Sequence, residues 1–145
     1  MDAAYLHLLV NHVPIILTLM GAAAAVLGLA TRRRAVWLYA LASLTIAGVT
    51  AYPVMLTGHA AEDVMKDKWY VTREAIHEHE ESGEMAMWVL IAMGAVSAYA
   101  WWGLVRRDRM EVPPVWLGAL VVLVSLAGVG TTTIAAYRGG NIVYY

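Results

Sequence analysis

The most constraining feature of this sequence is a set of four long apolar stretches that contain no Asp, Glu, Lys or Arg. They cover residues 11–30, 35–57, 85–105 and 114–137. A helix needs about 20 mostly apolar residues to cross a bilayer core, and every stretch reaches that length. Helices satisfy their own backbone polar groups where water is absent. The sequence therefore predicts an all-α integral membrane four-helix bundle, built as a single four-span domain over residues 1–145.

Composition excludes several other classes of protein. Hydrophobic residues make up 61% and charged residues 14% of the 145 positions, whereas a soluble domain is about 45–50% apolar and about 25% charged. A chain this short cannot bury so much apolar surface in a water-soluble fold. The net charge of −1 gives no field for nucleic acid. Because the chain has no cysteine, disulfides, iron–sulfur clusters and covalently attached haem are excluded.

Basic residues predict the orientation of the spans. Residues 32–34 are three consecutive arginines between the first two spans, and Arg106, Arg107 and Arg109 lie between the last two. Short loops rich in Lys and Arg remain on the cytoplasmic side. Segment 58–84 carries eight acidic and three basic residues, so we expect it to form an acidic extracytoplasmic helical loop. Both termini then face outward (N-out/C-out), and the expected location is a bacterial cytoplasmic (inner) membrane.

Small residues recur at four-residue spacing within the spans. The pairs are Gly21 and Ala25, Ala24 and Gly28, and Gly94 and Ala98. This spacing lets neighbouring helices approach closely. Ordinary helix packing accounts for it, and room for a flat cofactor is the alternative.

All five histidines fall at the outer end of the predicted bundle. They are His7, His12, His59, His77 and His79. Neutral imidazole binds haem iron, copper and zinc. Two imidazoles from different helices can hold a haem iron from opposite faces. The clustering therefore favours a haem or metal site near the extracytoplasmic face, against the alternative that interfacial histidines simply tolerate a wet position.

Helical faces choose between neighbouring histidines. His77 and His79 point about 200° apart on a helix. The face of His77 also carries Glu81 and is expected to be solvated, whereas the face of His79 carries Gly83 and Ala86 and is expected to pack. His79 is therefore the predicted ligand of this pair.

The first span offers His12 as the second ligand. Its face includes Ile15, Ile16 and Leu19, so we expect His12 to point into the bundle and His7 to lie at the surface. The prediction is that His12 and His79 bind one haem b as axial ligands, with His59 in reserve.

A non-haem site for copper, zinc or iron is the alternative use of the same region. His59, His77 and His79, with Glu62 and the outer methionines, would form it. Glu74-Ala-Ile-His77 has the Glu-x-x-His spacing of di-iron bundles. A solvated helix end accounts for that spacing equally well, because a di-iron site needs the motif twice.

Four short motifs resemble domain-of-unknown-function family 2231, a family of predicted four-span bacterial membrane proteins. The motifs are Leu6-His7-Leu-Leu-Val-Asn-His12-Val-Pro14-Ile15, Thr57-Gly58-x-Ala-Ala61-Glu62, Ile76-x-x-His79-Glu80 and Gly139-Gly140-Asn-Ile-Val143-Tyr144. The resemblance covers nearly the whole chain and implies a four-span fold, with His12 and His79 as the marked positions and haem binding as suggested for some relatives. The sequence departs from the family at Leu8, where the family has Pro, and at Asn11, where it tends to have Val.

Together these features predict a membrane cytochrome b-like electron-transfer subunit with its haem on the periplasmic side. Small size and the absence of catalytic motifs favour a subunit over a free-standing enzyme. Expected partners are the lipid bilayer, other subunits of a membrane redox complex, or a basic periplasmic cytochrome docked on the acidic loop. A non-haem metal-binding membrane protein and a cofactor-free structural anchor of a larger complex are the alternatives.

Overall fold

The chain folds into long helices in this computed structural model, which describes residues 2–69, 71–106 and 111–144, and these residues form no β-strand. The helices are α1 (Ala3–Val10), α2 (His12–Thr31), α3 (Arg34–Met65), α4 (Arg73–Arg106) and α5 (Val115–Tyr144). Four stretches are long and apolar enough to cross a membrane: Ala3–Thr31, Arg34–Met65, Arg73–Arg106 and Val115–Ile142. The predicted all-α fold with four span-like helices is confirmed.

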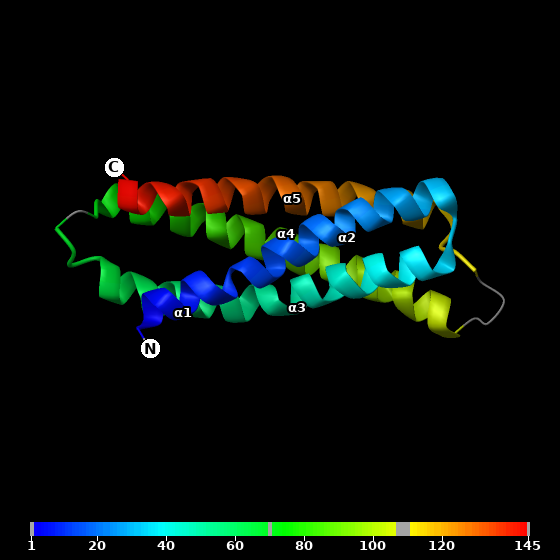
Figure 1. Cartoon of the computed structure of the whole chain (residues 1–145), viewed down its shortest axis with the longest axis horizontal. Helices are drawn as coiled ribbons and strands as arrows, with labels where there is room; N and C mark the ends of the chain where they lie inside the picture. Colours follow the sequence, from blue (N-terminus) through cyan, green and yellow to red (C-terminus); the bar gives the residue numbers. More distant parts are fainter. Residues whose placement is uncertain (1, 70, 107–110, 145) are drawn as a thin grey trace.

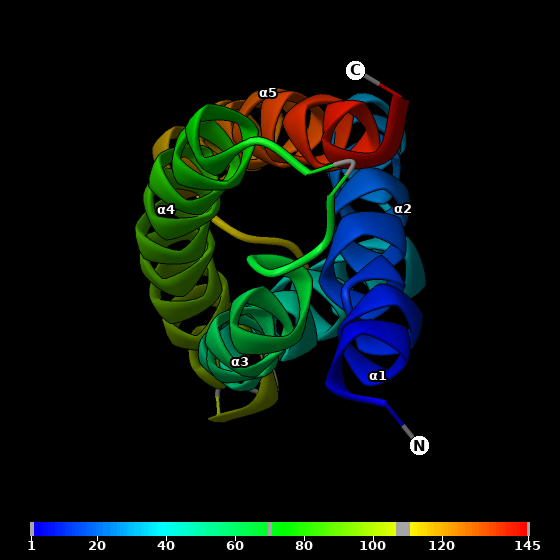
Figure 2. The same cartoon turned by 90° about the vertical axis from the view of Figure 1, so that its left-hand side faces the viewer.

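The long helices form an elongated bundle (Figure 1). Helices α2, α3, α4 and α5 pack in chain order, and α2 also packs on α5, so the four close into a ring (Figure 2). Helix α1 packs against α3. We call the end that holds α1, the α3–α4 link and the C-terminal part of α5 the terminal end. The opposite end, with Arg32 and Arg33 in the α2–α3 turn, is the arginine end.

Helical structure extends well beyond the predicted spans at the terminal end. Much of segment 58–84, which was expected to be a helical loop, belongs to α3 and α4, because α3 ends only at Met65 and α4 begins at Arg73. The Thr72 hydroxyl accepts a hydrogen bond from the Ala75 backbone N–H at 3.2 Å and caps α4. The acidic side chains therefore stand on the ends of two helices that frame this end of the bundle.

The first span also begins earlier than the expected start at Asn11. Asp2 caps α1 by accepting a hydrogen bond from the Ala4 N–H at 3.3 Å. Asn11 has helical dihedral angles and makes no side-chain cap; its backbone N–H donates to the His7 carbonyl. Helix α1 thus continues almost directly into α2. His7, on α1, lies beside α3.

The arginine end is fixed by a tight turn and one large side chain. Arg32 adopts a left-handed conformation (φ 52°) and its N–H bonds the Gly28 carbonyl at 2.9 Å, which ends α2. Trp37 is fully buried and packs on Gly28 and Gly118. Glycine at these two positions leaves room for the indole ring between α2, α3 and α5.

Small residues are frequent in the interior, and many large apolar side chains face outward. Fully buried positions include Ala25, Ala40 and Ala47, whereas Val49 and Leu123 are about two-thirds exposed, at 70% and 66%. In water such an exterior would be a large unfavourable patch. In a bilayer it meets lipid, and close helix packing replaces the hydrophobic effect as the main source of cohesion.

Candidate functional site

A cavity of about 630 Å³ lies at the terminal end of the bundle. Residues from all five helices line it, and most of them are apolar, including Leu8, Ile15, Val54, Met55, Ile76, Met87 and Leu90. Four imidazoles, those of His7, His12, His59 and His79, belong to the same lining. Small-molecule and cofactor sites have volumes of about 300–1,000 Å³ and combine apolar walls with a few polar groups, so this cavity has the size and character of a cofactor site.

The imidazole rings of His7 and His79 lie edge to face in the site. Their centroids are 6.3 Å apart and their planes make an angle of 70°. His7 comes from α1 and His79 from α4, and both side chains are half-buried. The bundle therefore brings two imidazoles from separate helices to one place.

The hydrogen bond of His79 defines which of its nitrogens carries the proton. Its Nδ1 lies 3.0 Å from the backbone carbonyl oxygen of Ala135 on α5. A carbonyl oxygen only accepts, so Nδ1 must donate its N–H. In the neutral ring Nε2 then holds a lone pair, which is the form of histidine that binds a metal.

The protonated nitrogen of His7 follows in the same way from its hydrogen bond to the Thr57 hydroxyl. The Thr57 hydroxyl donates to the Val54 carbonyl at 2.7 Å. Its oxygen is 3.0 Å from His7 Nδ1, and with its hydrogen already committed it accepts the N–H of that ring. Neutral His7 therefore also presents Nε2 with a lone pair, so the two rings share one tautomer.

Two glycines make room for the two rings. A Cβ added at Gly58 would lie 3.2 Å from His7 Cε1, and one added at Gly139 would lie 2.9 Å from His79 Cε1. Real Cβ atoms almost never come within 3 Å of a heavy atom that belongs to a distant residue. Any side chain at position 139 would therefore displace the His79 ring.

Gly139→Ala is expected to move the His79 ring, whereas Gly140→Ala, one residue further on, is not. The new methyl group at position 139 presses on the ring and stretches its bond to Ala135. A methyl group at position 140 meets nothing within 4 Å. Imidazole ¹⁵N chemical shifts should change for His79 only in Gly139→Ala, and this variant should be less stable than Gly140→Ala by about 1 kcal/mol. Equal spectra and equal stability would contradict the close packing at Gly139.

One buried polar atom in the cavity has no partner. The Asn11 side-chain oxygen is inaccessible to solvent and makes no hydrogen bond within the part of the chain that the structure describes. Asn11 belongs to the cavity lining. A buried acceptor that lacks a donor lowers stability at this position.

Three other predicted site residues lie at the rim of the cavity. His12 is exposed, and its Nδ1 donates to the Leu8 carbonyl at 2.7 Å. His59 is exposed and its Nε2 is 3.6 Å from Glu80 Oε1 on α4. Glu62 is half-buried and lines the cavity. All three share the cavity with His79.

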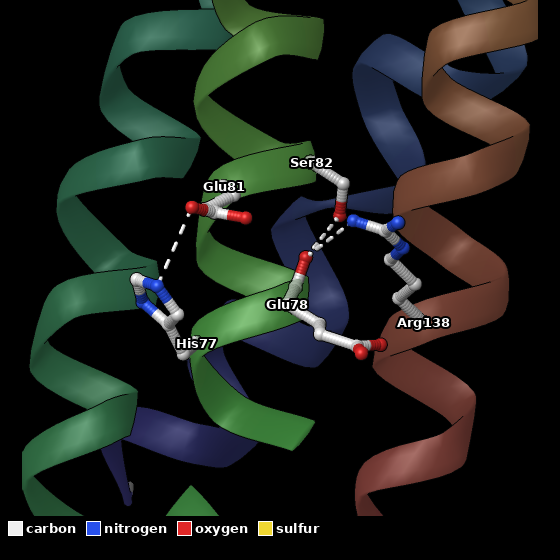
Figure 3. A network of polar contacts seen from close by, with 5 residues as sticks. All are labelled: His77, Glu78, Glu81, Ser82 and Arg138. Atoms are coloured by element: carbon white, nitrogen blue, oxygen red, sulfur yellow. Dashed lines mark hydrogen bonds and ion pairs between the residues drawn. The ribbon is translucent and has the colours of Figure 1, made fainter. Parts of the chain in front are cut away.

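His77 lies outside the cavity, as its helical face predicted. Its Nε2 is 3.3 Å from Glu81 Oε1 of the same helix, and both side chains are well exposed. Figure 3 shows these two residues on one side of α4, while Ser82 and Arg138 both reach the backbone carbonyl of Glu78. The Arg138 guanidinium bonds that carbonyl at 3.0 Å and so ties α5 to α4 one residue before His79.

The expectation that His7 lies at the surface is wrong. His7 is half-buried next to His79. Of the apolar face assigned to His12, Ile16 and Leu19 are more than half exposed, and only Ile15 lines the cavity. In a bilayer the outer face of a helix is as apolar as the inner face, so hydrophobicity does not distinguish them. The better signal is the stripe of small and polar residues at helical spacing, which continues from His7 through Asn11, Pro14, Thr18, Gly21 and Ala25.

The described residues do not form a set of metal ligands for the non-haem alternative. Within residues 2–69, 71–106 and 111–144, no group of three or more His, Asp or Glu side chains is placed to share a metal ion. His59 and His77 each approach a different glutamate. A haem needs only two axial ligands from the protein, so the pair of rings in the cavity remains compatible with it.

Comparison with known proteins adds no assignment. No protein-family model, no curated protein and no solved structure matches this chain. The resemblance to family 2231 therefore stays a prediction, and function must be inferred from the site.

Proposed function

We propose that this protein is a membrane cytochrome b-like electron-transfer subunit that binds one haem b in the cavity at its terminal end, with His7 and His79 as axial ligands. The observation that carries the proposal is the pair of imidazoles from α1 and α4, 6.3 Å apart, each with Nδ1–H bonded to a protein acceptor. His79 was predicted from the sequence, and His7 replaces His12 because its ring lies beside that of His79.

The spacing of the rings fits a shared metal. Metal–imidazole bonds are about 2.0–2.1 Å long, and adding about 1 Å from each nitrogen to its ring centre puts two axial rings about 6 Å apart. The apolar walls of the cavity suit a porphyrin. His12 and His59 lie at the rim of the same cavity.

The protein's own residues would set the properties of the iron. When bound, haem supplies reversible one-electron transfer. The Ala135 carbonyl and the Thr57 hydroxyl hold the two rings in the metal-binding tautomer, and hydrogen bonds of this kind raise the basicity of the ligand. The low polarity of the cavity walls controls solvent access to the site.

The visible spectrum of the purified protein tests this function. The chain is to be produced with haem supplied, extracted in neutral detergent and reduced with dithionite. A Soret band with sharp alpha and beta bands is expected. A colourless protein with a bound metal would favour the non-haem alternative, and one with neither cofactor would leave a structural anchor.

The orientation is part of the proposal and rests on charge. Among the residues that the structure describes, Glu111 is the one carboxylate at the arginine end, where Arg32 and Arg33 lie. The other carboxylates of these residues lie at the terminal end. By the positive-inside rule the arginine end is cytoplasmic. The haem site and the acidic helix ends then face the periplasm of a bacterial inner membrane, where a basic cytochrome or a partner subunit could dock.

Single-cysteine labelling tests the orientation, because the chain has no native cysteine. Lys68→Cys, in the α3–α4 link, is expected to react with an impermeant maleimide in spheroplasts. Glu111→Cys, at the arginine end, should react only after lysis. The reverse pattern would place the cavity on the cytoplasmic side and overturn the periplasmic assignment without affecting haem binding.

A further inference from the structure

An open apolar groove of about 450 Å³ lies between α2 and α3 on the outside of the bundle, near the arginine end. Its lining includes Met20, Ala23, Ala24 and Leu27 from α2 and Ala35 and Tyr39 from α3. Alanine side chains form much of its floor, and the longer side chains of Met20, Leu27 and Tyr39, each about half exposed, flank it. The groove belongs to the lipid-facing surface, well away from the histidine cavity.

The groove and the turn beside it together have about the length of one lipid leaflet. On α2 the groove is lined from Leu27 to Met20, and Met20 is 12 residues from Arg32 in the turn, or about 18 Å at a rise of 1.5 Å per residue. Half of a bilayer hydrocarbon core is about 15 Å. An acyl chain that starts at the turn would therefore follow the groove to about the bilayer midplane.

The turn beyond the end of the groove is positively charged, and Ala35, two residues after Arg33, lines the groove. Arg32 and Arg33 are both exposed and join α2 directly to α3. Neither forms an ion pair with a carboxylate among the residues described. Two guanidinium groups next to an apolar groove match the two parts of a phospholipid, a phosphate and its chain.

We propose that this groove is a binding site for an anionic phospholipid, with one acyl chain between α2 and α3 and the headgroup phosphate bound by Arg32 and Arg33. The site is independent of the proposed haem function. Charge complementarity selects an anionic lipid over a zwitterionic one, because each basic residue near an anionic headgroup favours binding by about fivefold. Since the arginines lie on the side assigned to the cytoplasm, the lipid would come from the inner leaflet.

Native mass spectrometry of the delipidated full-length protein tests the proposal. Phosphatidylglycerol and phosphatidylcholine with identical acyl chains are titrated separately. The wild-type protein is expected to prefer phosphatidylglycerol by roughly tenfold or more. In the Arg32→Gln/Arg33→Gln double variant this preference should disappear, and in the charge-matched control Lys66→Gln/Lys68→Gln, at the terminal end, it should persist.

Two further measurements separate the contribution of the acyl chain from that of the headgroup. Ala24→Leu, which partly fills the groove, is expected to weaken binding of both lipids, with folding checked by circular dichroism. Glycerol phosphate, which has no acyl chains, should not compete. Equal affinity for both lipids in the wild type, a preference retained in the double arginine variant, or competition by glycerol phosphate would overturn the proposal. So would a dimer that Ala24→Leu dissociates, since a second copy would then occupy the groove.

Discussion

Gly48→Ala is expected to destabilise the bundle by about 3 kcal/mol or more. A Cβ at position 48 would lie 2.7 Å from Gly94 Cα and 2.7 Å from the Leu90 carbonyl oxygen. These are backbone atoms of α4, so no side-chain rotation relieves the contact, and α3 and α4 must separate. Because α3 and α4 both contribute walls to the histidine cavity, their separation should also reduce ligand binding.

Gly103→Ala and Gly130→Ala are the matched controls. A Cβ at either position meets nothing within 4 Å. Each is therefore expected to be neutral or to stabilise its helix by up to about 1 kcal/mol, the difference in helix propensity between Gly and Ala. Denaturation in sodium dodecyl sulfate, followed by circular dichroism, measures all three variants. If Gly48→Ala proved as stable as the controls, the backbone contact between α3 and α4 would be refuted.

His7→Ala and His79→Ala are each expected to remove the low-spin haem spectrum. Loss of either imidazole leaves the iron with one strong axial ligand, and haem affinity should fall by about a hundredfold or more, since even changes to the groups that orient a ligand cost 10–100-fold. Haem retention through purification and the reduced spectrum report both effects.

Two other histidines of the same end provide controls. His77→Ala removes an exposed ring that pairs with Glu81 outside the cavity, and it should leave the spectrum unchanged. His12→Ala distinguishes the two ligand assignments, because it should be nearly silent if His7 is the ligand. A lost spectrum in His12→Ala with an intact one in His7→Ala would restore the assignment made from the sequence.

The sequence predicts the helices better than it predicts their faces. Charge-free apolar stretches locate the four spans, because helix is the expected backbone structure for such stretches in a bilayer. Their helical extensions at the terminal end are less apparent, since the apolar pattern stops at the predicted membrane boundary while α3 and α4 continue beyond it.

The candidate site was predictable in part. His79 lies beside Gly83 and Ala86 in the packed face expected for it, and His77 faces solvent. His7 was expected at the surface because an apolar face does not identify the inward side of a helix whose outer side meets lipid. The acceptors on Thr57 and Ala135 come from helices far away in sequence, so no local pattern indicates the tautomer of either ring.

Electron paramagnetic resonance of the oxidised wild-type protein tests the central claim most directly, because it reports the axial ligands of the iron. We predict a low-spin ferric signal from iron bound by two imidazoles whose planes are far from parallel, in keeping with the 70° between the rings of His7 and His79. The signal should become high-spin or vanish in either single alanine variant. A high-spin signal in the wild type, or a protein that binds no haem when haem is supplied, would contradict the proposed site.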